Sequence, residues 1–178
     1  MASLVTHAVA ALALGTAFYR PGTAKRVWVA GALASMLPDL DVLGFRFGVA
    51  YGDFFGHRGF THSLLFAAAL AFLVAAALGP RTGLSPGPLG AYLFLAAASH
   101  GLLDALTDGG LGVAFFSPFD NRRYFLPWRP IAVSPIGVRR FFTASGLLVF
   151  ESELVAVWLP ALVFAGAALL SRGRRQRT

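Results

Sequence analysis

The chain contains no cysteine, which excludes several kinds of chemistry. Disulfide frameworks, thiolate zinc sites and cysteine nucleophiles are all impossible. Any bound metal ion must therefore take nitrogen and oxygen donors from histidine and the acidic side chains. Those donors are few, because the sequence has 4 histidines and 8 aspartates and glutamates.

Charged residues are also scarce. They make up 13% of the 178 residues, and hydrophobic residues make up 57%, whereas soluble domains average about 25% charged and about 45–50% apolar residues. This balance indicates lipid as the surrounding solvent. The formal net charge is +7, but the basic residues lie in short segments between apolar runs, as membrane-flanking charge does, and we expect no nucleic-acid surface.

Five apolar stretches follow one another along the chain, separated by breaks rich in proline and glycine. Most are near the ~17–25 residues that a membrane-spanning helix needs. We therefore expect an all-α integral membrane protein in which residues 1–178 form one domain with about five transmembrane helices. The expected spans are 4–19, 27–45, 62–79, 89–106 and 146–170. The first lacks the positive leading segment of a cleavable signal, so we expect it to be a retained helix.

The segment 107–145, between the fourth and fifth expected spans, mixes aromatic residues, prolines and arginines. Such a segment is typical of the membrane interface, where aromatic side chains lie at the level of the lipid headgroups. Its arginines are candidates for binding anionic headgroups, although charge that sets the topology explains most of them more simply. These arginines are Arg122, Arg123, Arg129, Arg139 and Arg140.

Because successive spans alternate in direction, the histidines and aspartates at the ends of the first four spans should lie at the same membrane face. Carboxylates gathered in a poorly hydrated pocket repel one another, and either their pKa values rise or a cation neutralises them. Imidazoles among the carboxylates favour the cation, and histidine with aspartate suits zinc, manganese or iron. The candidate ligands, which include every histidine of the chain, are His7, Asp39, Asp41, His57, His62, His100 and Asp104.

Local spacing supports parts of this set. His100 and Asp104 have the spacing of neighbours on one helix face, as a shared metal ion requires. Asp108, four residues further on, extends the same stripe and is an additional candidate. Asp39 and Asp41 follow a proline at an expected helix end, and both carboxylates face one way if that segment is extended.

His57 and His62 cannot align on one helix face. We expect His57 in a loop and His62 in the first turn of the next helix, with Thr61 near its N-cap as a further candidate. Arg58, between the two histidines, is placed to hold a phosphate oxygen of a substrate. The alternative for Arg58 is an arginine that extends its charge towards the membrane surface.

Seven candidate ligands are too many for one tetrahedral ion, which takes three or four. We therefore favour a centre of two divalent ions, zinc first and manganese or iron as alternatives, bridged by Asp41 or Asp104. The expected catalytic residues are Arg58, Asp104 and Asp41. Each candidate ligand taken alone could have a purely structural role; His7, for example, could simply be a packed core residue. The inclusion of all four histidines argues against a purely structural role for the whole set.

Basic residues are almost evenly divided between the two membrane faces. The face with the candidate ligands would carry seven and the opposite face eight. Because the basic tail 172–177 directly follows a span, we expect a cytoplasmic C-terminus and a site on the extracytoplasmic face.

Five segments of the chain form a recognisable set: Thr6-His7, Pro38-Asp39-Leu40-Asp41, His57-Arg58-Gly59-Phe60-Thr61-His62-Ser63, His100-Gly101-Leu102-Leu103-Asp104 and Ser117-Pro118-Phe119-Asp120. Together they resemble the YdjM-like family of membrane-bound, metal-dependent hydrolases. The resemblance implies a prokaryotic inner-membrane hydrolase. The order of the residues is also similar, more distantly, to the all-helical zinc-dependent phospholipases C and related nucleases, which implies phosphoester cleavage by two or three metal ions. Those enzymes carry a late histidine followed four residues on by glutamate, which this chain lacks; Glu151 and Glu153 are available instead.

Three functions from different classes fit these residues. The first is a metal-dependent hydrolase of a lipid-like, anionic phosphoester, with membrane lipids as partners. The second is a membrane metalloprotease or amidase, although the chain has no HExxH segment to supply a general-base glutamate. The third is a non-catalytic metal-binding or transport protein, but transport would favour polar groups throughout the bilayer, and the later spans are apolar.

Overall fold

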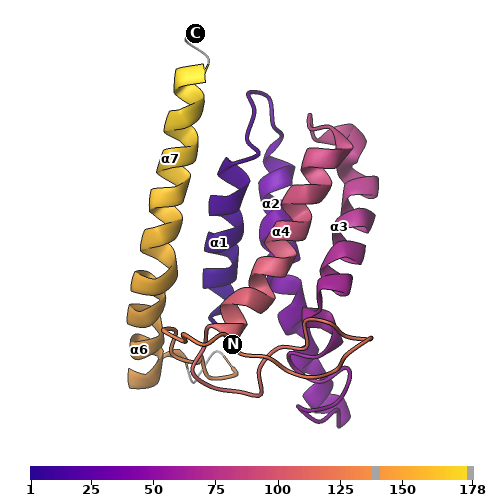
Figure 1. The fold of residues 1–178 in the computed structure, drawn as a ribbon, viewed down its shortest axis with the longest axis vertical. Helices are drawn as coiled ribbons and strands as arrows, with labels where there is room; N and C mark the ends of the chain where they lie inside the picture. The colour runs from indigo at the N-terminus through magenta and orange to yellow at the C-terminus, as the bar shows by residue number, and fades with distance from the viewer. Residues whose placement is uncertain (138–140, 176–178) are drawn as a thin grey trace.

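The computed structural model describes residues 1–137 and 141–175, and these residues form helices joined by loops (Figure 1). The only β pairings in this part of the chain are two isolated bridges, Thr107 with Ile131 and Val113 with Tyr124. The predicted all-α fold is therefore confirmed. Arg139, Arg140 and Arg177 lie outside the described residues, as do the side chains of Arg174 and Arg175.

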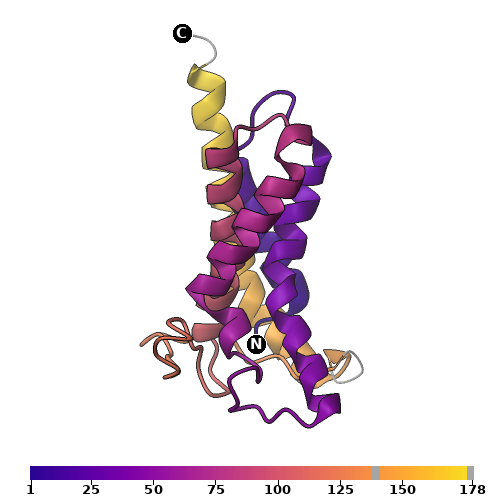
Figure 2. The ribbon, with the colours of Figure 1, turned by 90° about the vertical axis from the view of Figure 1, so that its right-hand side faces the viewer.

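Four helices pack side by side with alternating direction (Figure 2). They are α1 (Leu4–Thr16), α2 (Lys25–Met36), α3 (Leu64–Leu78) and α4 (Pro86–Ala105). A longer rod packs beside α1 and consists of α6 (Ala144–Glu153), the π-helical turn η4 (Leu154–Trp158) and α7 (Leu159–Arg175). Three short 3-10 helices complete the described helices: η1 (Leu37–Phe47), η2 (Phe60–His62) and η3 (Gly79–Arg81).

The start of α3 differs from the expectation. Its N-cap is Ser63, whose hydroxyl accepts a hydrogen bond from the Phe66 backbone N–H at 3.1 Å. His62 therefore precedes the helix, in η2, and the expected placement of His62 in the first turn was wrong, whereas Thr61 does lie near the N-cap. The Thr61 hydroxyl donates to Asp41 at 2.8 Å.

The end of α2 also differs. The α-helix stops at Met36, but the chain tightens into η1 through Phe47 and ends at Gly48, whose φ of +81° is the left-handed conformation that glycine adopts readily. The segment of Asp39 and Asp41 is therefore not extended, and the condition under which both carboxylates would face one way is not met. A 3-10 helix has three residues per turn, so side chains two positions apart point about 120° away from each other, and the two carboxylates lie beside different ring nitrogens of His62.

Half of the ten buried residues in the core between the four helices are alanines, which let the backbones approach closely, and the others are larger apolar residues and Tyr92. Tyr92 of α4 is the largest side chain in it, and its hydroxyl donates to the Ala11 carbonyl of α1 at 3.2 Å. Gly31 of α2 lies directly against this ring, so the close approach of α2 to α4 needs the missing side chain.

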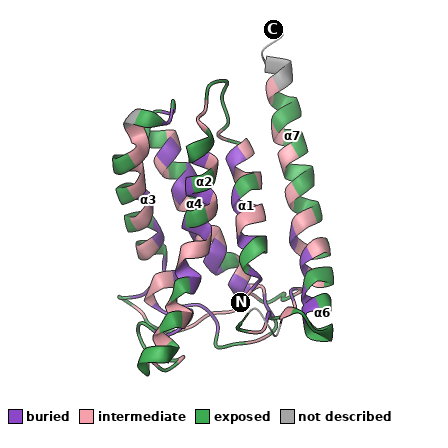
Figure 3. Ribbon diagram, turned by 180° about the vertical axis from the view of Figure 1, so that it is seen from behind, coloured by how far each residue is buried: buried purple, intermediate pink, exposed green. Residues whose placement is uncertain are grey.

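Two helical stretches are long and apolar enough to cross a membrane, Lys25–Phe47 and Ala144–Arg172. The five expected helices are present near their expected positions, but α1 and α3 have 13 and 15 residues, fewer than the ~20 of a typical span. Two candidate spans, and not five, follow from length and composition. The second stretch is almost wholly uncovered by the rest of the chain (Figure 3).

The Gly31–Tyr92 contact predicts a specific effect on stability. Gly31→Ala overpacks the α2–α4 contact and costs about 1–3 kcal/mol, which lowers the melting temperature of the detergent-solubilised protein followed by tryptophan fluorescence. Gly90→Ala is the matched control, because its added methyl meets open space on α4 and alanine is favoured over glycine in a helix by about 1 kcal/mol. Equal melting temperatures for the two variants would contradict this packing.

Candidate metal centre

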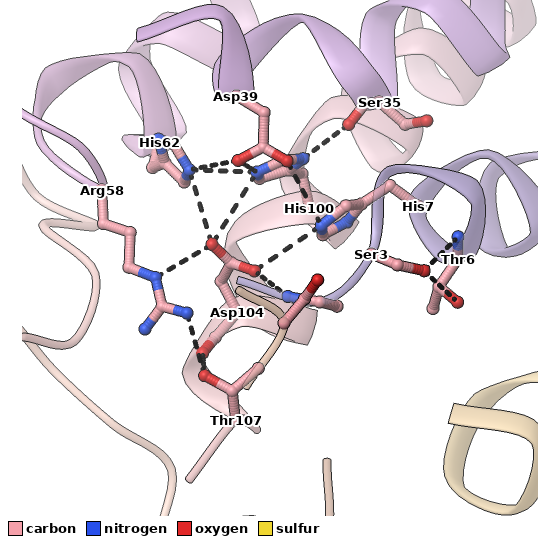
Figure 4. Close-up of polar contacts among 12 residues, drawn as sticks. Ser3, Thr6, His7, Ser35, Asp39, Arg58, His62, His100, Asp104 and Thr107 are labelled. Atoms are coloured by element: carbon pink, nitrogen blue, oxygen red, sulfur yellow. Dashed lines mark hydrogen bonds and ion pairs between the residues drawn. The ribbon is translucent and has the colours of Figure 1, made fainter. Parts of the chain in front are cut away.

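The expected ligands converge at one end of the helical bundle, beside the starts of α1 and η1 and the end of α4, and Figure 4 shows five of them, His7, Asp39, His62, His100 and Asp104. Four of their side chains form a compact group, Asp39, His62, His100 and Asp104. At most 5% of any of these four residues is exposed. The group draws on three separate elements, η1, η2 and α4, so only the folded chain assembles it.

The spacing of the four donor atoms is that of a metal-binding shell. The Nε2 atoms of His62 and His100 are 3.0 Å apart, and each lies 3.5–3.9 Å from Asp39 Oδ1 and Asp104 Oδ2. Zinc–nitrogen and zinc–oxygen bonds of about 2.0–2.2 Å give tetrahedral edges of about 3.3–3.6 Å. The donors therefore surround a space of the right size for one ion.

The other ring nitrogens fix which imidazole atoms face this space. His100 Nδ1 lies 2.6 Å from the Ser35 carbonyl oxygen, which can only accept, so Nδ1 carries the proton. His62 Nδ1 lies 3.1 Å from the Thr61 hydroxyl and 3.2 Å from Asp41 Oδ2, and because that hydroxyl donates to Asp41, Nδ1 is again the donor. In the neutral rings, both Nε2 atoms thus present lone pairs to each other, and only a proton or a metal ion between them relieves the repulsion.

Buried atoms without hydrogen bonds gather at this point of the structure. Within the described residues, no hydrogen bond is present for either oxygen of Asp39, for either nitrogen of His7, for His57 Nε2, or for Asp104 Oδ2 and Arg58 Nε, which form an ion pair with each other. Buried polar atoms are otherwise nearly always paired. The donor chemistry, the spacing and these unpaired atoms together fit a divalent metal ion.

Asp41 belongs to a second group, with His57 and His62. Asp41 Oδ1 lies 2.7 Å from His57 Nδ1, and Asp41 Oδ2 accepts from the Thr61 hydroxyl and, at 3.2 Å, from the Arg58 backbone N–H. Burial lowers the pKa of the His57 imidazole, and the hydrogen bond to Asp41 opposes this shift. A carboxylate that orients a ligand histidine through its second nitrogen is a common support for metal sites, and Asp41 stands in that relation to His62.

Arg58 is completely buried and has a left-handed φ of +64°, which is rare outside glycine. Its Nε lies 3.1 Å from Asp104 Oδ2, and its Nη atoms donate to the Gly109 carbonyl and the Thr107 hydroxyl, each at 2.9 Å. The alternative of an arginine extended to the membrane surface was wrong. Arg58 instead sits against the candidate ligands.

Comparison with known proteins identifies the family of the chain. The family described as "YdjM inner membrane protein" matches residues 1–175. The chain belongs to the YdjM family. It is 43% identical over 168 residues to inner membrane protein YbcI of Escherichia coli (strain K12), which covers 93% of this chain and 96% of that protein. It is also 31% identical over 119 residues to the uncharacterized protein YvsG of Bacillus subtilis (strain 168), covering 62% of this chain and 71% of that one. No solved structure matches the chain.

Several expected participants of this YdjM-family chain lie elsewhere. Because α4 ends at Ala105, the helical stripe stops before Asp108, which is exposed and accepts from the Val133 backbone N–H at 2.8 Å. Glu151 is exposed, whereas Glu153 is buried and accepts from the hydroxyls of Ser3 and Thr6 at 2.6 and 2.7 Å. The structure therefore brings neither Asp108 nor the two glutamates into either group of candidate ligands of the described residues.

The two adjacent arginines of the long loop have different environments. Arg123 donates to the carbonyl oxygens of His57, Tyr51 and Asp53 at 2.7–3.1 Å, so it clamps the loop that carries His57 and Arg58. The exposed Arg122 pairs with Asp120, and its hydrogen bonds lower the pKa of that carboxyl to about 2. Arg122 is the one of the two whose guanidinium remains open to solvent.

Sequence reasoning missed several contacts that hold the YdjM-family site together. Asp104 Oδ1 accepts from the Ala2 backbone N–H at 2.8 Å, and Thr107 holds Arg58. The third missed contact is the hydrogen bond that the Ser35 carbonyl accepts from His100. The feature of the sequence that could have predicted this contact is Pro38. Proline has no N–H, so it cannot donate to the carbonyl three residues earlier as a 3-10 turn would, and that oxygen is left for His100.

The Arg123 clamp predicts a local change in dynamics. Arg123→Lys removes the planar guanidinium that contacts three carbonyl oxygens. Each lost hydrogen bond costs about 1 kcal/mol, so we expect hydrogen exchange in this loop to be about 10-fold faster than in the wild-type protein, or more. The measurement is exchange of the backbone amides of 51–59 by mass spectrometry. Arg122→Lys is the control and should leave the exchange rates unchanged. Equal protection in the two variants would show that Arg123 does not hold the loop.

Proposed function

We propose that this YdjM-family protein is a membrane-embedded, metal-dependent hydrolase that cleaves a phosphoester of a lipid or lipid-like substrate. The observation that carries the proposal is the buried group of Asp39, His62, His100 and Asp104, with two imidazole Nε2 atoms facing one another. Family membership is compatible with this activity. A bound divalent ion, zinc before manganese or iron, supplies Lewis-acid activation of water and of the phosphoryl oxygen.

The chain's own residues have separate roles in this proposal. Asp104 would hold the ion, and its Oδ2 atom forms an ion pair with Arg58 Nε. Asp41 orients His62 and fixes the loop through Thr61 and the Arg58 backbone. Arg58 places a positive charge beside the ligands in a buried region of low dielectric, where it would stabilise the negative charge that develops on a phosphoryl group.

The surroundings of the site support a substrate that arrives from the membrane surface. The loop between α4 and α6 lies at the same end of the bundle as the ligands (Figure 1). It exposes Phe119 and Trp128, with 86% and 70% of each residue accessible. Aromatic side chains of this kind favour the headgroup region of a bilayer, and Arg122 beside them offers a charge for an anionic headgroup. We propose membrane lipids and an anionic, lipid-like substrate as the partners.

A non-catalytic metal-binding membrane protein is the second candidate, and the burial of the ligands favours it. Four protein donors close a tetrahedral zinc shell, as in structural sites, whereas catalytic sites keep a position for water. Hydrolysis requires a fifth ligand or a second ion. A metalloprotease or amidase would use the same ligands, and a peptide substrate panel separates it from a phosphoesterase.

We further propose that residues 1–178 form one multi-pass domain in which five helical stretches cross the inner membrane. The bundle geometry supports this, since α1 and α3 lie alongside α2 and α4. Short helices are accommodated by local thinning of the bilayer. The basic segment after α7 supports a cytoplasmic C-terminus and an extracytoplasmic site.

Cysteine labelling tests this topology directly, because the natural chain has no cysteine. Asn121→Cys, in the loop at the site end, should react with a membrane-impermeant maleimide added to intact spheroplasts. Ser85→Cys, in the exposed turn before α4, should react only after the cells are opened. The reverse pattern would invert the orientation, and labelling of both residues in intact spheroplasts would contradict the crossing of α4.

The hydrolase proposal predicts chelator-sensitive turnover. Purified protein in detergent should cleave phosphoester or phospholipid substrates, and Asp104→Ala should lower the rate by about 100-fold or more, because it removes a ligand. Asp108→Ala is the matched control, an exposed aspartate four residues away, and should retain wild-type activity. Bound metal without turnover on any phosphoester would favour the non-catalytic candidate instead.

A further inference from the structure

His7 is the one histidine that belongs to neither ligand group of the described residues. It lies on the first turns of α1, is completely buried, and neither ring nitrogen has a hydrogen-bond partner within the described chain. Its ring stacks on that of His100, with centroids 3.7 Å apart. A buried imidazole with both nitrogens unpaired needs an explanation, because such groups are rare and costly.

The Nε2 atom of His7 faces the two carboxylates that hold the first ion. It lies 3.5 Å from Asp104 Oδ1 and 4.0 Å from Asp39 Oδ2. The oxygens that face His62 and His100 are the opposite ones, Asp104 Oδ2 and Asp39 Oδ1. Each carboxylate therefore presents one oxygen to the His62–His100 pair and the other oxygen to His7.

We propose that a second divalent cation binds among His7 Nε2, Asp39 Oδ2 and Asp104 Oδ1, so that Asp39 and Asp104 bridge two ions. This inference rests on the proposed function, since it places a second ion beside the first. Carboxylate-bridged pairs of ions, about 3.5–4 Å apart, are the usual arrangement in metal-dependent phosphoesterases. The hydrogen bond from Ala2 to Asp104 Oδ1 uses one of the two lone pairs of that oxygen and leaves the other for the ion.

The group of Asp41, His57 and His62 is a weaker second site. A neutral imidazole has one lone pair, and His62 directs it from Nε2 towards His100, while its Nδ1 donates to Thr61 and Asp41. A second ion there would keep only Asp41 and His57. Asp41 is already occupied by its hydrogen bonds to His57, Thr61 and the Arg58 backbone.

Charge balance connects the second ion to the substrate class. The charged groups around the ligands are the carboxylates of Asp39, Asp41, Asp104 and Glu153, the Arg58 guanidinium, which pairs with Asp104, and the N-terminal amine, which interacts with Asp104, Asp39 and Glu153. The two remaining negative charges are neutralised by one divalent ion. A second ion adds an excess of positive charge to a region of low dielectric, which an anionic substrate offsets. A centre with two ions therefore selects a phosphoester over a neutral amide.

The test counts ions and detects their coupling without measuring turnover. Protein purified in detergent is stripped with chelator, loaded with MnCl2 and freed of excess metal. We expect about two manganese ions per wild-type chain by elemental analysis and an exchange-coupled pair by electron paramagnetic resonance. His7→Ala should bind about one ion, with the spectrum of an isolated ion. His57→Ala should keep two coupled ions.

Each result separates this inference from the proposed function. One uncoupled ion in the wild-type protein, unchanged in His7→Ala, would overturn the second site and leave the first intact. Loss of the second ion in His57→Ala but not in His7→Ala would place it at Asp41 and also overturn the proposal. No bound manganese in the wild-type protein would overturn both. Because the coupled signal is measured on the wild-type chain, the test holds even if a variant misfolds.

Discussion

The structure at the ligand end depends on two imidazole nitrogens that face each other across 3.0 Å, His62 Nε2 and His100 Nε2. Each ring has its proton fixed on the far side, one by the Ser35 carbonyl and the other by Thr61 and Asp41. Lone pairs held this close require a positive centre between them. The carboxylates on either side, with unpaired buried oxygens, make a divalent ion a better fit than a single proton.

Local backbone chemistry brings the two rings together. Ser63 starts α3 one residue after His62, and the absent N–H of Pro38 leaves the Ser35 carbonyl for His100. The left-handed conformation of Arg58 turns its side chain towards Asp104. The buried polar groups are thus concentrated at one end, while the rest of the bundle packs through alanines and larger apolar residues.

Apolar runs were sufficient to predict the helices, and the four-residue spacing correctly put His100 and Asp104 side by side. They were not sufficient for the segments between helices. Tertiary contacts determine whether the chain after Pro38 is extended or forms a 3-10 helix. Because it forms a 3-10 helix, the side chains of Asp39 and Asp41 point in different directions. The helix end at Ala105, which excludes Asp108, and the positive φ of Arg58 have no clear local sequence signal. The candidate ligands could be predicted as a set, but not their division into ion-facing and supporting residues.

The central claim is that a divalent ion lies between His62 and His100, and anomalous X-ray diffraction at the zinc edge tests it most directly. Crystals of the zinc-loaded protein should show an anomalous peak about 2.0–2.1 Å from both Nε2 atoms, the length of a zinc–imidazole bond. An absence of anomalous density there, with the two nitrogens still at hydrogen-bond distance, would mean that a shared proton holds the rings together. That result would contradict the account.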